Sequence, residues 1–166
     1  MKGFRAPSFA TSNYAMRQIA ESGYLYDSSY NSFSLHGRYG QISLNGTGKK
    51  GIAYKISDNF FELPISNLMI YRRVLPWGGG AYFRLIPLPI FNLGIKKIIR
   101  HQDAYILYAH PWEFDPEQPR VNQASFKYRF RHYTGLNNAS EKLHKLIKEF
   151  RHCWFITCSR YLELIG

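Results

Sequence analysis

The chain has 166 residues, which fits one domain or a large part of one. Its 22 lysines and arginines outnumber its 11 aspartates and glutamates, and the net charge of +11 favours an anionic partner, although the basic residues are too dispersed to predict a specific nucleic-acid footprint. No apolar run is long enough to cross a bilayer and the first residues lack the apolar core of a signal peptide, so no membrane span is expected and the cytoplasm is the default compartment.

The first third of the chain predicts one helix, one short strand and a loop. Ser12 is placed to cap the helix, apolar residues follow at helical spacing, and Gly23 is placed to end it. Residues 24–26 then predict a strand that ends at Asp27. Residues 31–59 are rich in serine, glycine and asparagine, which predicts a loop.

The middle of the chain predicts extended segments on either side of a helix. Residues 60–70 have an apolar, extended pattern, and the glycines of residues 75–80 predict a flexible loop. Pro89 suits the first turn of a helix that closes near His101. Residues 104–109 form a near-continuous apolar run, which predicts a parallel strand buried on both faces.

The last third of the chain predicts a helix, a strand and a helical turn. Residues 138–141 resemble a capping box in front of an amphipathic helix. Residues 153–157 predict a final strand, and residues 161–164 a terminal helical turn. Cys153 and Cys158 have the spacing of neither a redox pair nor a zinc knuckle, so we expect two reduced, partly buried thiols.

The order of these elements indicates a fold class. Helices that alternate with short buried strands predict an α/β architecture with parallel pairing. Only three or four strands are visible, whereas a closed α/β barrel needs about eight strands in about 250 residues. We therefore expect residues 1–166 to form a single partial domain, an incomplete distorted (β/α) barrel whose N-terminal strands are missing.

Three polar clusters directly follow strand candidates, where α/β folds place their chemistry. They are Arg5-Ala6-Pro7-Ser8, Tyr26-Asp27-Ser28-Ser29 and His110-Pro111-Trp112-Glu113. Aromatic residues make up 17% of the chain, and exposed aromatic rings are suited to stacking on sugars or bases. A further group fits an anionic glycan, a nucleic-acid backbone or structural salt bridges, and consists of Arg129, Arg131 and His132.

Several longer strings carry a family resemblance. They are GFRAPSF (3–9), GYLYDSS (23–29), LPWGGGAYFR (75–84), LYAHPWEFDPEQPRV (107–121) and FRHYTGL (130–136). They resemble polysaccharide deacetylases of the NodB-homology family, in the branch associated with bacterial exopolysaccharide and exosortase loci. The resemblance covers nearly all of residues 2–150 and implies that the chain is the C-terminal part of such a domain.

The resemblance implies metal-dependent hydrolysis of N-acetyl groups on a polysaccharide. In that family a zinc-type divalent ion activates water, an aspartate takes the proton of that water, and a histidine protonates the departing amine. His110 matches the Leu-x-x-His motif and hence the acid. Arg5 matches the arginine that orients the basic aspartate, and Asp27 falls where an acidic residue holds the acid histidine.

The predicted substrate contacts are Pro7, Trp77, Tyr82 and Trp112. The Asp-Asp and His-x-x-x-His motifs that supply the family's base and metal ligands do not occur in the 166 residues. We therefore predict no metal or cofactor site in this chain, although a divalent metal is expected for a complete domain of the family, and we expect the chain alone to be inactive.

Two alternatives remain open. The first is a non-catalytic glycan-binding or interaction remnant that uses the aromatic residues and the positive charge. The second is a nonspecific nucleic-acid binder, which rests on net charge alone. The sequence names neither the polysaccharide nor an oligomeric state.

Overall fold

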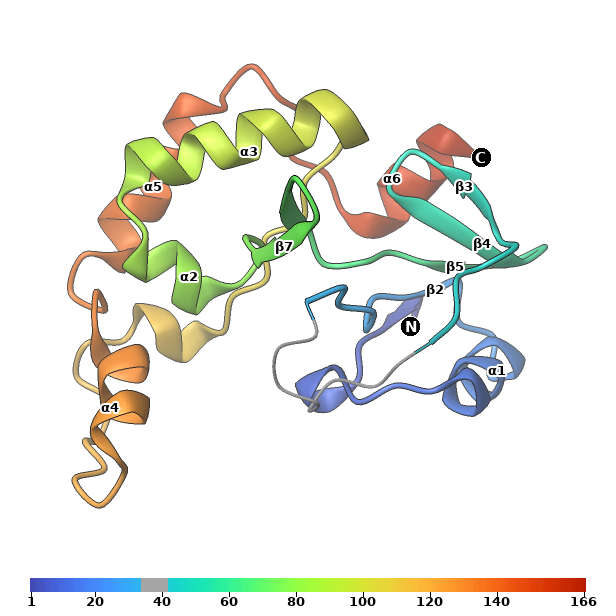
Figure 1. Ribbon diagram of the computed structural model, residues 1–166. Helices are drawn as coiled ribbons and strands as arrows, with labels where there is room; N and C mark the ends of the chain where they lie inside the picture. Colours follow the sequence, from blue (N-terminus) through green and yellow to red (C-terminus); the bar gives the residue numbers. More distant parts are fainter. Residues whose placement is uncertain (34–41) are drawn as a thin grey trace.

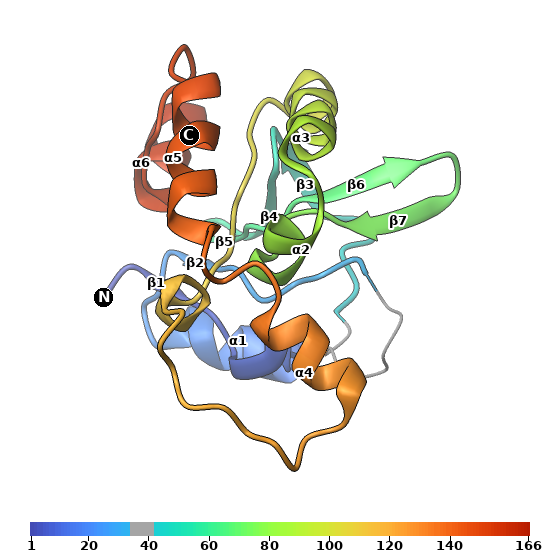
Figure 2. The same ribbon diagram turned by 90° about the vertical axis from the view of Figure 1, so that its left-hand side faces the viewer.

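The computed structural model describes residues 1–33 and 42–166, and it is a mixed α/β structure around one open sheet (Figure 1). In order across the sheet, the strands are β1 (Gly3–Phe4), β2 (Tyr26–Asp27), β5 (Phe60–Glu62), β4 (Ala53–Ser57) and β3 (Gly48–Lys50). The first three are parallel, whereas β3 and β4 pair antiparallel. A separate hairpin of β6 (Asn67–Ile70) and β7 (Arg73–Pro76) projects from the body in Figure 2.

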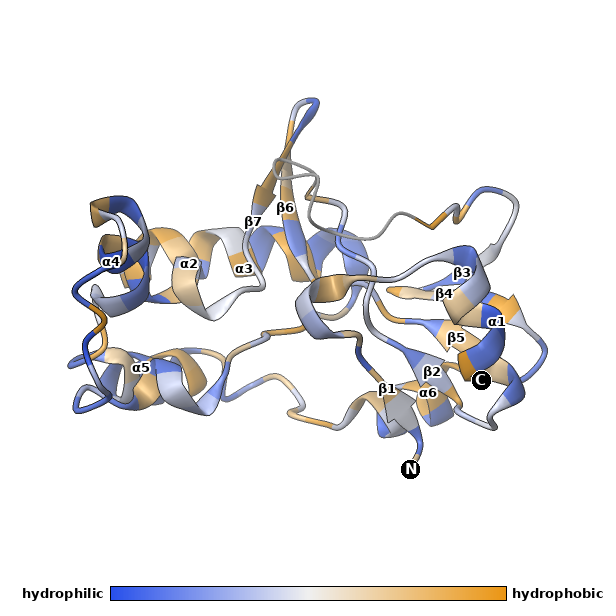
Figure 3. Cartoon of the chain, turned by 90° about the horizontal axis from the view of Figure 1, so that it is seen from below, coloured by the Kyte–Doolittle hydropathy of each residue, from blue (hydrophilic) through white to orange (hydrophobic). Residues whose placement is uncertain are grey.

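The helices lie in two groups. The described part of the chain forms α1 (Asn13–Glu21), α2 (Gly80–Leu85), α3 (Leu88–Gln102), α4 (Phe126–Tyr133), α5 (Ala139–Glu149) and α6 (Cys158–Ile165), with short 3₁₀ turns η1 (Pro7–Phe9) and η2 (Pro111–Phe114). Helices α1 and α6 cover opposite faces of the sheet, while α2 to α5 gather at the other end of the molecule (Figure 3). In the described ranges no helix is both long and apolar enough to cross a bilayer.

Side-chain alternation along β5 and its extension explains why both faces of the sheet are covered. Phe60 packs with Met16 and Ile19 of α1, and all three side chains are buried. Leu63 points to the opposite face and packs near Leu162 of α6. Successive residues of a strand face opposite sides of the sheet. A strand that has apolar residues on both sides therefore needs a helix against each face of the sheet.

A second apolar core lies between α3, α5 and the segment that enters α2. The Trp77 ring stacks on Phe91 with centroids 5.5 Å apart, and its Nε1 donates a hydrogen bond to the Phe91 carbonyl oxygen at 2.9 Å. Gly94 of α3 provides the space for this ring, because a Cβ there would lie 2.2 Å from the indole. Leu146 and Phe150 close the core from α5.

Gly94→Ala is expected to lower the free energy of unfolding by about 1–3 kcal/mol, because the added methyl group overpacks the Trp77 ring. In an unobstructed helix the same change stabilises by about 0.5–1 kcal/mol, so the sign of the effect tests the contact. Urea denaturation measures the difference. Gly48→Ala is the control, because the nearest atom to a Cβ there is 4.0 Å away. A stabilised Gly94→Ala variant would contradict the packing.

The helix predictions are confirmed. Ser12 caps α1 by accepting a hydrogen bond from the Ala15 amide at 3.1 Å, and Gly23 ends it with φ at 81°. Helices α3 and α5 lie where their apolar spacing places them, and α6 is longer than the predicted turn. Both cysteines are free and half-buried, as expected. The capping box is not formed, because the Asn138 side chain makes no capping hydrogen bond.

Several extended predictions need correction. The described residues form no closed barrel, and a distorted barrel is not confirmed. Residues 104–109 are half-buried and make one isolated parallel bridge, from Tyr108 to Gly79, instead of a regular strand. Residues 153–157 form no strand within the described ranges, and Trp154 in this segment is 80% exposed. Apolar composition alone had predicted both strands, and strands also require a partner.

Two predicted loops also contain regular structure. The predicted loop at 31–59 includes strands β3 and β4, and its residues 34–41 lie outside the described residues. The glycine run is not a flexible loop. The Gly78 carbonyl oxygen accepts from the Tyr108 amide at 2.6 Å, and the Gly80 amide donates to the Tyr108 carbonyl oxygen at 2.7 Å. A Cβ at Gly80 would lie 1.9 Å from Glu113 Oε2, so glycine permits the close approach of η2.

Candidate functional site

One cavity combines aromatic walls with titratable side chains. Its volume is about 550 Å³, within the range of about 300–1,000 Å³ that is usual for ligand pockets. Its aromatic lining includes Phe9, Phe33, Tyr82, Tyr108, Trp112, Tyr128 and Tyr133. Its ionisable lining consists of Arg84, His110, Glu113, Arg129, Arg131 and His132, besides the tyrosines. A second hollow of about 810 Å³ has Lys49 as the one charged side chain among its described lining residues, so these offer little acid–base chemistry.

His110 is held from two directions at the start of η2. Its backbone amide donates to Glu113 Oε2 at 2.9 Å, and its ring Nε2 is hydrogen-bonded to the Tyr108 hydroxyl. Residues two apart on an extended segment share a side, which explains how Tyr108 reaches the ring. His110 is therefore an ordered imidazole that borders the cavity, with Nε2 already engaged.

The Trp112 indole lies between two imidazoles. Its ring stacks on His110 with centroids 5.4 Å apart and an interplanar angle of 16°, and on His132 at 4.5 Å and 12°. Trp112 is 37% exposed and lines the cavity, so its role as a substrate contact stays a prediction. Its stacking also orients the two histidine rings.

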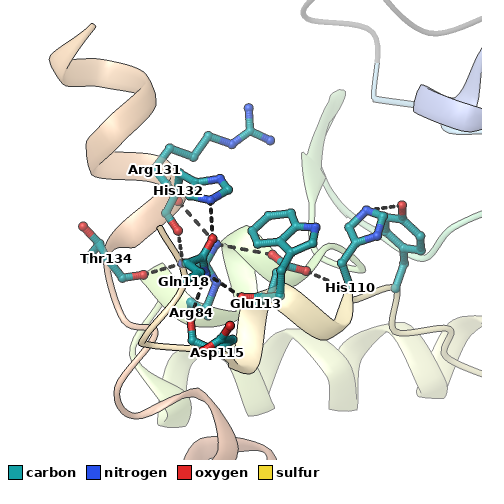
Figure 4. A network of polar contacts seen from close by, with 10 residues as sticks. Arg84, His110, Glu113, Asp115, Gln118, Arg131, His132 and Thr134 are labelled. Carbon is teal, nitrogen blue, oxygen red and sulfur yellow. Dashed lines mark hydrogen bonds and ion pairs between the residues drawn. The ribbon is translucent and has the colours of Figure 1, made fainter. Parts of the chain in front are cut away.

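A buried ion pair lies beneath the stacked rings of His110, Trp112 and His132. Arg84 Nη2 lies 3.3 Å from Glu113 Oε1, and the two side chains are 1% and 4% exposed. Arg84 Nη1 also donates to the carbonyl oxygens of His132 at 3.0 Å and Thr134 at 2.5 Å (Figure 4). Because Glu113 also accepts from the His110 amide, one ion pair connects α2, η2 and the end of α4.

His132 is the last of the three stacked rings, on the side of α4. Its Nε2 is hydrogen-bonded to Gln118 Oε1 at 2.7 Å (Figure 4). Burial lowers the pKa of His132 below its ordinary value, and the nearby guanidinium groups of Arg84 and Arg120 lower it further. The neutral imidazole is therefore favoured at His132.

Arg5 reaches the His110 site indirectly. Its Nε donates to the Ser28 carbonyl oxygen at 2.8 Å and its Nη2 to Ser28 Oγ at 2.6 Å. Its guanidinium lies 4.8 Å from the centroid of the Tyr108 ring, on the residue that holds His110. Burial lowers the pKa of Arg5 from its ordinary value, although a guanidinium remains charged across the physiological range.

Asp27 forms a buried carboxyl pair with Glu62. The two residues are partners in the parallel register of β2 and β5, and both are fully buried. Ser29 Oγ donates to Asp27 Oδ1 at 2.7 Å, and the Tyr30 amide donates to Glu62 Oε1 at 2.9 Å. Burial and the neighbouring Asp27 side chain raise the pKa of Glu62 to about 9, so the Glu62 carboxyl keeps its proton at neutral pH.

The remaining oxygens support a protonated Glu62 carboxyl. Asp27 Oδ2 and Glu62 Oε2 are buried, and no N–H or hydroxyl donor in the described part of the chain reaches them. A protonated Glu62 carboxyl supplies an O–H donor beside these oxygens. No hydrogen bond joins Asp27 to His110 among the described residues, so the predicted orienting contact is replaced here by the Tyr108 hydroxyl.

The other predicted substrate contacts divide between cavity and core. Tyr82 lines the cavity, with the Arg131 guanidinium 5.5 Å from the centroid of its ring. Trp77 is 7% exposed in the second core, so it is unsuited to the predicted role of a sugar platform. Pro7 is exposed at the start of η1 and does not line the cavity, where Phe9 lies instead.

Sequence reasoning missed Tyr108, Glu62 and the pairing of Arg84 with Glu113. Glu62 stands alone among Phe60, Phe61 and Leu63, and an isolated acid in an apolar strand is a signal of a buried carboxyl. Across residues 1–33 and 42–166 no group of three histidine, cysteine, aspartate or glutamate side chains is arranged to hold a metal ion. The divalent metal of the resembled family has no fitting ligand set there.

Comparisons with known proteins give one family. A family model described as "Domain of unknown function (DUF3473)" matches residues 28–163. This family is associated with polysaccharide deacetylase-like proteins. The matched range contains the cavity residues around His110 and excludes Arg5 and Asp27. No curated protein and no solved structure matches the chain.

Proposed function

Because the chain belongs to the DUF3473 family, we propose that its cavity binds an N-acetylated polysaccharide and presents His110 as the general acid of a deacetylase site of the NodB-homology type. The observation that carries the proposal is the ordered His110 ring beside an aromatic cavity of ligand size. Aromatic walls suit the apolar faces of sugar rings, and an imidazole held in a fixed orientation suits proton transfer.

The proposed acid step uses the imidazole ring of His110. The Tyr108 hydroxyl orients that ring through Nε2. In the imidazolium both nitrogens carry protons, so a ring N–H donates its proton to the amine nitrogen as the C–N bond breaks. General acid catalysis of this kind contributes typically about 10²–10⁴-fold.

The complete hydrolysis also needs an activated water and a base. No described residues form a metal site, and the base motif of the resembled family is absent from the sequence, so no step is assigned to them here. In this proposal the chain supplies the general acid and the sugar-binding surface. The lack of a ligand set in the described ranges favours, as second candidate, a glycan-binding module that performs no catalysis.

Tyr82→Ala is expected to weaken binding of an N-acetylglucosamine hexamer roughly threefold to tenfold, because the cavity loses one aromatic wall. Calorimetric titration of the full chain measures the dissociation constant. The control is Tyr14→Ala, which removes a tyrosine that is 72% exposed on α1 outside this lining. Equal losses in the two variants, or no binding by the unchanged chain, would contradict a glycan site in this cavity.

Acetate release separates the two candidate functions. The chain incubated with Zn²⁺ and the same hexamer is expected to release no acetate, because it lacks the base and the metal ligands of the resembled family. Release that His110→Ala lowers by about 10²–10⁴-fold would support the acid role. It would also contradict the expectation that this chain lacks the base and the metal ligands. Release that is unchanged in His110→Ala would contradict the acid role itself.

A further inference from the structure

The α4 side of the cavity carries two arginines whose charge is not neutralised. Arg129 and Arg131 are exposed and line the cavity. Arg129 Nη1 donates to the Asn122 carbonyl oxygen at 3.3 Å, and the Arg131 guanidinium lies over the Tyr82 ring. No salt bridge in the described part of the chain involves either side chain. Both guanidinium groups therefore retain donors for a ligand.

Among the described residues of the cavity wall, no unpaired carboxylate faces these arginines. Glu113 is the one carboxylate among the described lining residues, and it is 4% exposed and paired with Arg84. Its Oε2 is also used by the His110 amide. The Glu113 charge is thus neutralised beneath the cavity, and the accessible wall is positive.

The direction of the pKa shift of His132 agrees with a positive cavity wall. After burial, the Arg84 guanidinium is the largest influence on its pKa, and it acts to lower that pKa, as does Arg120. Only the Glu113 carboxylate acts in the opposite direction. Burial is the first cause of this shift, and the part due to the two guanidinium groups agrees with the positive wall formed by Arg129 and Arg131.

We infer that the cavity selects an acidic glycan, in which a carboxylate-bearing sugar lies next to the N-acetylated one. The inference rests on the proposed function and adds the substrate class. Tyr82 and Tyr128 supply aromatic surface for sugar rings, while Arg129 and Arg131 supply forked donors that match a carboxylate.

The same features favour a glycan over a nucleic acid. Single-stranded nucleic acids are bound along grooves whose basic residues follow successive phosphates. Among the residues that the structure describes, two arginines without an ion pair border the cavity, and they lie on one short helix, α4. Two charges on one side of an aromatic cavity suit one acidic group on one sugar.

The test compares two hexasaccharides of equal length. One is the neutral N-acetylglucosamine hexamer, and the other is a hyaluronan hexasaccharide, in which N-acetylglucosamine alternates with glucuronic acid. Calorimetric titration at low salt is expected to give about tenfold tighter binding of the acidic oligomer. Arg131→Ala is expected to remove most of that preference, and Arg131→Lys to retain part of it. The control, Arg17→Ala, removes an exposed arginine of α1 and is expected to change neither constant.

The outcomes distinguish this inference from the proposed function. If neither oligomer binds, the glycan site itself fails. If both bind equally through the Tyr82 wall, the proposed function stands and the acidic preference is wrong. An equal loss of affinity for the acidic oligomer in Arg131→Ala and Arg17→Ala would show that the preference arises from the net charge of +11, and it would overturn the inference. Equally tight binding of an oligothymidylate of the same length would also overturn it, because the cavity would then recognise charge without a sugar.

Discussion

Replacing Arg84 with methionine should lower the free energy of unfolding by about 3–5 kcal/mol, because the change leaves Glu113 charged, buried and without its partner. The same change removes donors from the carbonyl oxygens of His132 and Thr134, so the end of α4 loses its attachment to α2. Urea denaturation measures the loss, and weakened glycan binding is expected with it, since α4 supplies one wall of the cavity.

The double variant Arg84→Met with Glu113→Gln tests whether the charge is the cause. It is expected to recover part of the lost stability, because no unpaired charge remains in the core. Lys145→Met is the matched control, since it breaks an exposed ion pair with Glu141 on α5 and should have no measurable effect. A single Arg84→Met variant as stable as this control would contradict the buried pair.

Glu62→Gln should stabilise the protein at alkaline pH. In the folded protein the pKa of Glu62 is raised to about 9, above its ordinary value of 4.5, so folding favours the protonated carboxyl. That contribution is fully present below the unfolded pKa and is lost as the pH rises from about 4.5 to about 9, by up to about 1.4 kcal/mol per pH unit. Glutamine is neutral throughout, and its amide can donate to Asp27 while its oxygen accepts from Tyr30.

Urea denaturation at about pH 5, 7 and 9 measures this difference. The two proteins are expected to be nearly equal at the lowest pH, with the advantage of Glu62→Gln growing at each step. Glu141→Gln is the control, because Glu141 is exposed on α5 and its pKa is lowered by Lys145. Parallel pH profiles for the unchanged protein and Glu62→Gln would contradict the buried carboxyl pair.

Local signals predicted α1, α3, α5 and part of α6, but they did not predict α2 or α4. Ser12 and Gly23 bound α1 because a cap and a left-handed residue act within one turn. The segments 104–109 and 153–157 failed for the opposite reason. Their apolar composition is local, but a strand also requires a neighbour, and within the described ranges the second segment has none.

The site was predictable only in part. His110 and Tyr82 both line the cavity, and their roles as acid and substrate contact stay predictions. Arg84 and Glu113 are 29 residues apart, and nothing in their separate strings indicates that they meet. Asp27 faces Glu62 because β2 and β5 are neighbours in register, which is a property of the sheet order. Long-range pairings of this kind decide the roles of charged residues, and sequence patterns do not contain them.

Histidine ring resonances give the most direct test of the central claim, that the cavity beside His110 is a glycan site. The N-acetylglucosamine hexamer, titrated into the protein, is expected to shift the ring signals of His110 and His132, which both border the cavity. His144 is the internal reference, because it is exposed on α5 outside the lining. Saturable shifts at His110 and His132 with an unchanged His144 are the predicted result. An unchanged His110 signal at saturating hexamer, or equal shifts at all three histidines, would contradict the account.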